Sequence, residues 1–236
     1  MSKLTKLLLV TLLILSTLFI NSVMAKGWTA QEALERFNAI LVEHPNDIDI
    51  LKEKAQVEYY LGKLEDSIKT YTKALSIVQN EQLYNDRGLV KHSLGDAKGA
   101  IDDFNKAIEI NNKYAPAYAN RASAKADFNN DIKGAIEDCE QAIIFNPKYS
   151  DAYYNKANFE DTLKLYKEAI DDYKKAISLN PQNIDAYNNL GLTLSKVGKK
   201  EEAIKYVKNA IKLYQKTGNY EYMENSKRLL NYIINE

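Results

Sequence analysis

The chain is poor in the residues that most often carry chemistry or form β-turns. Its 236 residues include one cysteine, two histidines, four prolines and nine glycines. The single cysteine, Cys139, excludes an intrachain disulfide framework and any zinc or iron–sulfur site built from several cysteines. Two histidines, His44 and His92, leave few metal centres or catalytic arrangements. So little glycine and proline argues against a fold with many β-turns and favours a helical protein.

Neither sign of charge predominates either. Lysine and arginine together number 32, as do aspartate and glutamate, so the formal net charge is zero. A nucleic-acid binder would need a basic surplus to displace counterions from phosphates, so no nucleic-acid partner is predicted. The chain also lacks a glycine-rich phosphate loop, a Ser–His–acid set and a metalloprotease histidine motif. We therefore predict a protein that is not an enzyme and has no metal or cofactor.

The first 25 residues have the pattern of a secretory signal peptide. Lys3 and Lys6 precede an uncharged apolar run that ends near the small residue Ala25. The alternative is an uncleaved anchor, with residues 4–24 as a membrane tether, because this apolar run approaches the length that spans a bilayer. Lysine also greatly outnumbers arginine. Together these features predict a bacterial protein exported to the periplasm or envelope, with anchoring in the inner membrane as the alternative.

Small residues recur along most of the chain with a period of 33 to 35 residues. Large residues stand four positions before the first series, and mostly aromatic ones four positions after the second. Spacings of three, four and seven place these residues on single helix faces, so each period contains two amphipathic helices. Small side chains let the two helices approach closely. The three series are Ala55, Gly88, Ala122, Ala157 and Gly191; Ser67, Ala100, Ala135, Ala169 and Ala203; and Ala74, Ala107, Ala142, Ala176 and Ala210.

This pattern resembles the tetratricopeptide repeat (TPR) family. One period matches the family at every position of its pattern, namely Tyr153, Ala157, Ala169, Tyr173, Ala176 and Pro181. An earlier period also matches, except that Asn112 stands where proline is usual. The resemblance implies an all-α fold, a right-handed α–α superhelix of tandem helix–turn–helix repeats with N- and C-terminal capping helices.

The period also predicts the organisation of the chain. A residue is inserted in the turn after Phe128. A lone capping helix is expected from Thr29 to Val42, and Tyr222, Ser226 and Ile233 are expected to mark a C-terminal capping helix. The predicted parts are 1–25, signal peptide or anchor; 26–47, N-terminal capping helix and half repeat; 48–80, 81–114, 115–149, 150–183 and 184–217, repeats 1 to 5; and 218–236, C-terminal capping helix.

The resemblance further implies a concave groove lined by the first helix of each repeat. Asparagine side chains there could both donate to and accept from a peptide backbone, and tyrosine would add flat apolar contact. The alternative is structural, because ordinary repeats carry similar residues at these positions. The predicted peptide-binding residues, called the groove residues below, are Lys52, Tyr59, Asn85, His92, Asn120, Ser123, Tyr154, Asn155, Asn158, Asp161, Asn188 and Asn189.

The partner of such a groove follows from its charges. One TPR subclass grips acidic C-terminal peptides with lysine, arginine and asparagine, but Gln56, Asp86 and Pro116 stand at its later positions here. Acidic residues outnumber basic ones along the predicted groove, so we expect a neutral or basic protein segment. The predicted function is that of an exported adaptor or scaffold. The alternative is a membrane-anchored or self-associating envelope assembly protein that uses its convex or terminal surfaces, and the oligomeric state is open.

Three pairs of adjacent acids precede or flank the aromatic position of the second helices. They are Asp102–Asp103, Glu137–Asp138 and Asp171–Asp172. Adjacent residues on a helix do not face each other, so these are poor metal or acid–base pairs and are expected to be solvated on the convex face. A second hypothesis is that they neutralise Arg87, Lys91, Arg121 and Lys125 across helices. Cys139 occupies an aromatic core position and is expected to be a buried, inert thiol, and His92 a polar surface contact.

Overall fold

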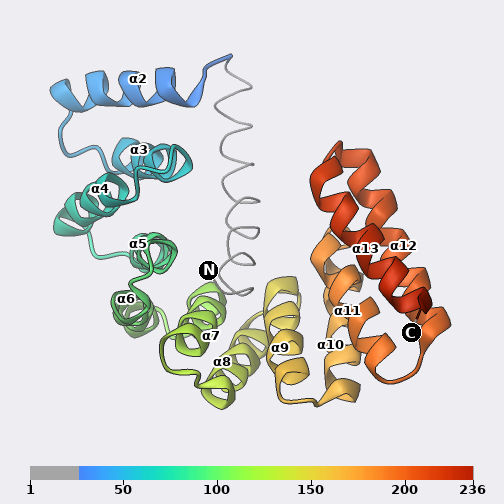
Figure 1. Ribbon diagram of the computed structural model, residues 1–236. Helices are drawn as coiled ribbons and strands as arrows, with labels where there is room; N and C mark the ends of the chain where they lie inside the picture. The colour runs from blue at the N-terminus through green and yellow to red at the C-terminus, as the bar shows by residue number, and fades with distance from the viewer. Residues whose placement is uncertain (1–26, 236) are drawn as a thin grey trace. The chain divides into compact units, whose positions relative to one another are not determined.

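The computed structural model describes residues 27–235, so the predicted signal peptide lies outside the described residues. These residues form two compact units, 27–131 and 132–235, which together contain twelve helices (Figure 1). Unit 1 contains α2 (Ala30–Glu43), α3 (Ile48–Tyr60), α4 (Leu64–Ile77), α5 (Glu81–Leu94), α6 (Ala97–Ile110) and α7 (Ala115–Asn129). Unit 2 contains α8 (Ile132–Phe145), α9 (Ser150–Thr162), α10 (Tyr166–Leu179), α11 (Ile184–Lys196), α12 (Lys200–Thr217) and α13 (Tyr220–Asn235).

Within each unit, every helix packs against the next one along the chain, so the helices form sequential pairs. The first helices of neighbouring repeats also touch, α5 with α7 in unit 1 and α9 with α11 in unit 2. This arrangement confirms the all-α class and the helix pairs that the period predicts. It also places the predicted groove residues of neighbouring repeats within reach of one another.

The turn between the two helices of a repeat requires a residue in the left-handed region. Glycine supplies it at Gly62, Gly95 and Gly198, with φ of 74°, 94° and 77°. Asn130 and Lys164 adopt the same region, with φ of 57° and 62°. Only glycine enters this region without a steric cost from its Cβ, and asparagine tolerates it better than lysine. The turn is thus imposed by the packing of the helices even where the sequence offers no glycine.

Helix α2 begins at Ala30, one residue after the expected start of the N-terminal capping helix, because Thr29 is its N-cap. The Thr29 side chain accepts from the Glu32 backbone N–H, while the Glu32 carboxylate accepts from the Thr29 backbone N–H at 2.7 Å. This reciprocal capping box satisfies two donors that would otherwise be unpaired at the helix start. The helix buries Ala33, Leu34 and Phe37, which are the residues that pack it onto the remainder of unit 1.

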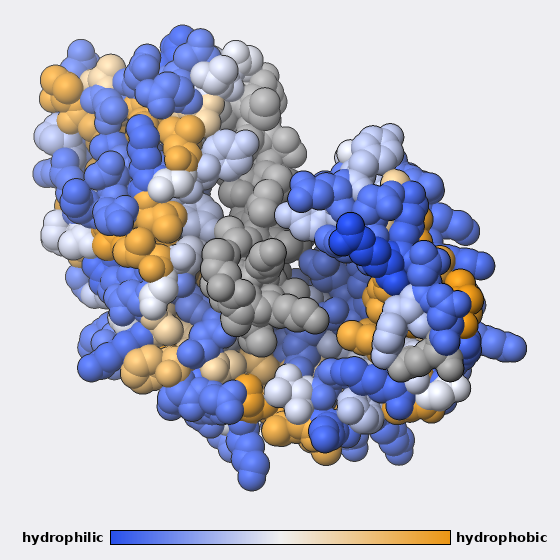
Figure 2. Space-filling view, viewed as in Figure 1, coloured by the Kyte–Doolittle hydropathy of each residue, from blue (hydrophilic) through white to orange (hydrophobic). Residues whose placement is uncertain are grey.

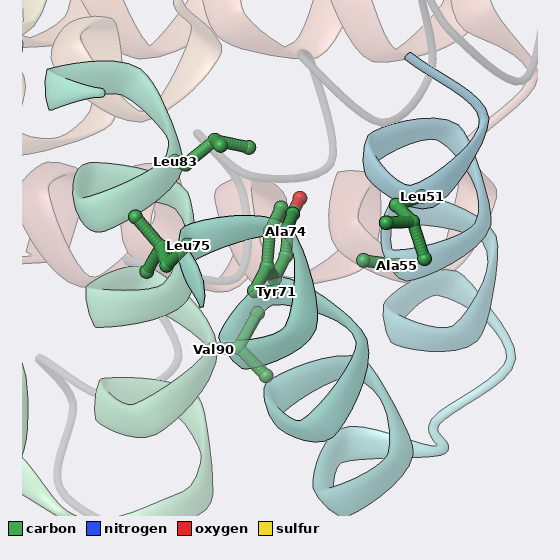
Figure 3. Close-up of a cluster of buried hydrophobic side chains, with 7 residues drawn as sticks. All are labelled: Leu51, Ala55, Tyr71, Ala74, Leu75, Leu83 and Val90. Atoms are coloured by element: carbon green, nitrogen blue, oxygen red, sulfur yellow. The ribbon is translucent and has the colours of Figure 1, made fainter. Parts of the chain in front are cut away.

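The small residues of the repeat are explained by close contacts between the paired helices. A Cβ added at Gly88 would lie 2.7 Å from the Phe104 ring, and one at Gly191 would lie 2.4 Å from Val207. Both distances are shorter than any real contact allows, so these two crossings have room for glycine only. Figure 3 shows the corresponding cluster in unit 1, where side chains of α3, α4 and α5 meet around Tyr71, which is 2% exposed.

Two of the three residues expected to mark the C-terminal capping helix are buried in α13 (Tyr220–Asn235). Ser226 and Ile233 are buried, as is Met223, but Tyr222 is 51% exposed. Tyr222 instead stacks on Tyr214, with ring centroids 6.2 Å apart. Tyr222 therefore lies beside the buried stripe of α13 and not within it.

The acidic pairs were expected to be solvated, but in two of the three pairs the second residue is buried. Asp103 and Asp138 are only 3% and 4% exposed, whereas Asp102 and Glu137 are exposed. Asp103 is buried because it pairs with cations on the neighbouring helix, as described below, and this confirms the hypothesis of neutralisation for that residue. Cys139 is fully buried, and burial raises the pKa of its thiol, so it is protonated as predicted.

The surface of the described residues is mixed in character. Figure 2 shows a face covered mainly by hydrophilic residues, with separate hydrophobic patches among them. Large exposed hydrophobic side chains include Val42, Phe128 and Ile144. Across residues 27–235, no helix has the length and apolar character needed to cross a membrane. The same part of the chain holds no group of three or more His, Cys, Asp or Glu that could bind a metal.

Candidate functional site: polar side chains on the first helices

Hydrogen bonds join the predicted groove residues of neighbouring repeats. In unit 1, the Tyr59 and Ser93 hydroxyls lie 3.2 Å apart, and Asn120 Nδ2 donates to Asn85 Oδ1 at 2.8 Å. The first pair links α3 to α5 and the second links α5 to α7. Each bond therefore ties the first helix of one repeat to the first helix of the next.

His92 takes part in the same pattern. Its Nε2 lies 3.0 Å from Asp127 Oδ2, which joins the last turn of α5 to α7. The side chain is 4% exposed, and among the described residues its buried Nδ1 has no hydrogen-bond partner. The expectation of a surface contact is thus corrected, because the imidazole is buried and pairs with a partly exposed carboxylate of the next repeat.

Unit 2 carries an amide and tyrosine network on α9, α10 and α11. Asn189 Nδ2 donates to Tyr154 Oη at 3.2 Å and to Asn158 Oδ1 at 2.9 Å. Tyr173 Oη donates to the same Asn158 oxygen at 2.6 Å. Asn158 is therefore fixed from both neighbouring helices, and its amide orientation is set by these two donors.

Asp161 forms the second link in unit 2. It accepts from Thr193 Oγ1 at 2.8 Å and pairs with Lys196 Nζ, both on α11. The Asp161 side chain is 20% exposed and that of Lys196 is 33% exposed. This ion pair thus lies nearer to solvent than the amide network.

A single rule of position describes these links. The fifth residue of a repeat bonds to the sixth residue of the next repeat, and the twelfth residue bonds to the thirteenth of the next. The two partners are therefore 34 or 35 residues apart. We call the set the polar ladder. Its pairs are Tyr59–Ser93, Asn85–Asn120 and His92–Asp127 in unit 1, and Tyr154–Asn189 and Asp161–Lys196 in unit 2.

The ladder divides the groove residues by exposure. Four expose less than a tenth of their surface, namely Asn85, His92, Ser123 and Tyr154. Ser123 donates to its own helix, at Ala119 O. The others are half-buried, namely Lys52, Tyr59, Asn120, Asn155, Asn158, Asp161, Asn188 and Asn189. Contact with a peptide stays a prediction for all twelve, and the half-buried ones offer it more surface.

Carboxylates beside the ladder are partly desolvated. Burial raises the pKa of Asp86 to about 6, against the opposing effects of nearby Lys52 and of a 3.3 Å bond from Asn85 Nδ2. In unit 2, burial raises the pKa of Asp151 and Asp185, each opposed by a hydroxyl donor, Ser150 or Tyr214. A raised carboxyl pKa means that the charged form lacks donors, so a cation placed beside these groups would be stabilised.

The polar ladder and the bond from Thr193 to Asp161 bring in four residues that were not among the predicted twelve. They are Ser93, Asp127, Thr193 and Lys196, and each bonds to a predicted residue of the preceding repeat. Ser93, Asp127 and Lys196 could have been found from the sequence, because each is a polar residue at the thirteenth position of a repeat and follows a polar residue at the twelfth position of the preceding repeat. Thr193 lies one turn before that position and carries no such signal.

Comparisons with known proteins agree with the repeat organisation. A family model described as "TPR repeat" matches residues 165–198, and models described as "Tetratricopeptide repeat" match residues 81–114 and 184–217. The last two ranges are those of the predicted repeats 2 and 5. Two of these matches fall in unit 2 and one falls in unit 1.

Curated relatives share only a part of their length with this chain. A TPR repeat-containing protein of Methanocaldococcus jannaschii, MJ1428, is 30% identical over 87 residues, which is 36% of this chain and 15% of that protein. Tetratricopeptide repeat protein 13 of Homo sapiens is 24% identical over 82 residues, which is 35% of this chain and 10% of that protein. The likeness is thus confined to repeats within much longer proteins.

Solved structures resemble the chain over more of its length. MamA is 29% identical, with a TM-score of 0.59 over 70% of this chain and 97% of MamA. The Cut9–Hcn1 structure gives a TM-score of 0.73 at 17% identity, over 87% of this chain and 39% of that one. YrrB, described as a TPR protein with an unusual peptide-binding site, gives 0.54 at 19% identity, over 83% and 99%. The last two likenesses concern the fold alone.

Proposed function

The chain belongs to the tetratricopeptide repeat family, a scaffold family that mediates protein–protein interactions, and from that premise we propose an adaptor that holds an extended segment of a partner protein. The segment is neutral or basic and lies along the first helices of the repeats. The half-buried members of the groove residues contact it. No reaction is involved, and the partner's identity follows from the side chains that these repeats present at fixed offsets.

The observation that carries this proposal is the polar ladder. By joining the first helices at equivalent positions, the ladder fixes the side chains before a partner arrives, which lowers the entropy lost on binding. Asp86, Asp151 and Asp185 stand beside it as partly desolvated carboxylates. A lysine or arginine of the bound segment would supply the donors that these groups lack.

We also propose that the protein is exported and works in the envelope of a bacterium. The support is the pattern of residues 1–25 in the sequence, with its basic start and uncharged apolar run. In this setting the repeats bring exported proteins together. Cleavage after Ala25 and retention as a tether are both compatible with the adaptor, and N-terminal sequencing of the mature protein distinguishes them.

Photo-crosslinking in cells tests the groove. A photo-reactive amino acid at Asn155, a half-buried groove residue on α9, should trap a heterologous protein. The matched control is Glu168, an exposed residue on α10, which should not trap the same protein. Adducts that form equally at both positions would contradict binding of the partner in the groove. Self-adducts at Asn155 would replace the adaptor with a self-associating assembly protein.

The charge of the partner has its own test. Because the pKa of Asp86 is about 6, lowering the pH through 6 adds a proton and removes its attraction for a cation. Capture of a basic partner should therefore weaken between pH 7.5 and pH 5.5, on the order of several-fold. Asp86→Asn should bind more weakly at pH 7.5 and show a flatter pH profile. An unchanged profile in the variant would show that other groups carry the dependence.

A further inference from the structure

Four lysines form one exposed stripe along α12. They are Lys205, Lys208, Lys212 and Lys216, and all four are exposed. Spacings of three, four and four residues place them on a single helix face. The opposite face is the buried one, formed by Ala203, Val207, Ala210 and Tyr214. The lysine stripe is therefore the outer face of the second helix of repeat 5.

The lysine stripe has no anionic partner within residues 27–235. None of its members forms an ion pair or a side-chain hydrogen bond there, whereas exposed Lys69, Lys106 and Lys227 each pair with an acid three residues away. Like charges four residues apart weaken a helix by a few tenths of a kcal/mol. Lys216 in the last turn is favoured by the helix dipole, but no ion pair within residues 27–235 offsets the repulsion among the four lysines.

The stripe is specific to this repeat. In α6, the positions of the first three stripe lysines are occupied by Asp102, Asn105 and Glu109. In α8, the positions of the first two are occupied by Glu137 and Glu140. The outer face of the second helix is acidic in those repeats. Helix α12 is also 18 residues long, against 14 for α10, and the added turn carries Lys216. Neither the repeat pattern nor the core explains four lysines here.

We propose that the lysine stripe binds an anionic lipid surface. Four to eight basic residues on an amphipathic helix suffice for attraction to anionic headgroups. The stripe runs for about 16 Å at 1.5 Å per residue, and no apolar side chain interrupts it. A protein interface centres on dry apolar anchors, which the stripe lacks, whereas a headgroup layer presents diffuse charge and needs none.

Two exposed tyrosines follow the stripe along the chain, but they do not extend its face, because Tyr222 stacks on Tyr214 of the opposite face of α12. Tyr220 and Tyr222 follow Lys216 at the start of α13 and are 64% and 51% exposed. The lysine stripe lies on a second helix and the groove residues lie on first helices. Lipid attraction is therefore independent of the proposed peptide binding.

Vesicle sedimentation with the full chain tests the proposal. The protein is mixed with vesicles of phosphatidylcholine alone or of phosphatidylcholine with phosphatidylglycerol, so that an effect of the apolar N-terminal segment appears in both. Replacing the four stripe lysines by glutamine should lower partitioning into the anionic vesicles at least about 10-fold at low salt. Binding of the unchanged protein should also weaken with added salt.

A matched variant removes the same charge elsewhere. It replaces Lys63, Lys73, Lys98 and Lys113, which are exposed on unit 1, and it should bind anionic vesicles almost as the unchanged protein does. Equal loss in both variants, or no preference for anionic vesicles, overturns the proposal. A parallel binding assay with bulk RNA tests whether the stripe binds nucleic acid instead of anionic lipid. Loss of RNA binding without loss of vesicle binding in the stripe variant would also overturn it.

Discussion

Repeats 2 and 4 place ionisable side chains at the same three positions but with opposite balance. In repeat 2, Arg87 and Lys91 on α5 share one carboxylate, Asp103 on α6, at 2.7 and 2.8 Å. In repeat 4, a single cation, Lys156 on α9, is shared by Glu160 at 3.0 Å and by Asp172 of α10 at 2.9 Å. The first cluster has an excess of positive charge and the second an excess of negative charge.

The difference shows which arrangement satisfies its buried atoms. Arg87 holds both Asp103 oxygens through two parallel N–H donors and gives a third N–H to Thr72. In repeat 4, the Glu160 side chain is 5% exposed, and its Oε2 has no partner among the described residues. Burial raises the pKa of Glu160 to about 7, since Lys156 cannot fully offset it. The repeat 2 cluster therefore satisfies both oxygens of its buried carboxylate, whereas the repeat 4 cluster leaves one buried carboxylate oxygen without a donor among the described residues.

The largest effect is expected from breaking the repeat 2 cluster. Asp103→Asn leaves two cations without their shared carboxylate, and both are at most 19% exposed. We expect a loss of about 3 kcal/mol in the free energy of unfolding, since an uncompensated buried charge is costly. Chemical denaturation measures it. The adjacent Asp102→Asn is the matched control, and it should change stability by less than about 0.5 kcal/mol. Equal effects would remove the distinction between the two carboxylates.

Repeat 5 shows how all three charged residues of the repeat 2 cluster can be replaced by uncharged ones, so that no charge is left without a partner. It carries Leu190 and Leu194 at the positions of Arg87 and Lys91, and both leucines are fully buried. Replacing both cations by leucine, together with Asp103 by tyrosine as in repeat 5, should alter stability by about 1 kcal/mol or less. A loss as large as that of Asp103→Asn would mean that the ion pairs are needed for more than mutual neutralisation.

The repeat 4 cluster should respond to pH. The pKa of Glu160 is about 7 in the folded protein against 4.5 for the free group, so the folded state holds this proton more tightly. The contribution to stability is therefore full below pH 4.5 and is lost as the pH rises to 7. Glu160→Gln should stabilise the protein by about 1 kcal/mol at pH 8, once solvent screening is allowed for, and very little at pH 4.5.

Thermal unfolding across this pH range measures that difference. The control is Glu140→Gln, because Glu140 also faces Lys156 but at 3.9 Å and with half of its side chain exposed. Its effect should be small and should not vary between pH 4.5 and pH 8. A Glu160→Gln difference that stays constant with pH would assign the stabilisation to packing instead of titration.

The repeat period predicted the helix pairs because it records a steric demand. Gly88 stands opposite Phe104, and no larger residue fits between their backbones, so the spacing of small residues marks each crossing. The C-terminal helix shows where that reasoning ends. Met223 is buried and Tyr222 is exposed, because the rotation of α13 is set by its packing on α11 and α12, which the repeat period does not encode.

The candidate site was predictable in position but not in pairing. Asn85, Asn120, Tyr154 and Asn189 are among the predicted groove residues, yet their bonds depend on rotamers and on the offset between neighbouring repeats. The buried ion pairs were harder to predict. A run such as Asp102–Asp103 looks uniformly polar in sequence, and only packing separates the exposed carboxylate from the buried one.

The smallest effect concerns the turn that joins the helices in the same two repeats. Gly95 forms it in repeat 2 with φ of 94°, and Lys164 forms it in repeat 4 with φ of 62°. A non-glycine residue in this region costs about 1–2 kcal/mol, and glycine loses about 0.5–1 kcal/mol more backbone entropy on folding. Lys164→Gly should therefore stabilise the protein by about 0.5–1 kcal/mol, measured by chemical denaturation, and Gly95→Lys should destabilise it by a similar amount.

Lys164→Ala separates conformation from charge, because alanine removes the ammonium group but keeps the Cβ that causes the strain. If Lys164→Ala stabilised the protein as much as Lys164→Gly, the lysine charge, and not the left-handed turn, would be the source of the difference between the two repeats.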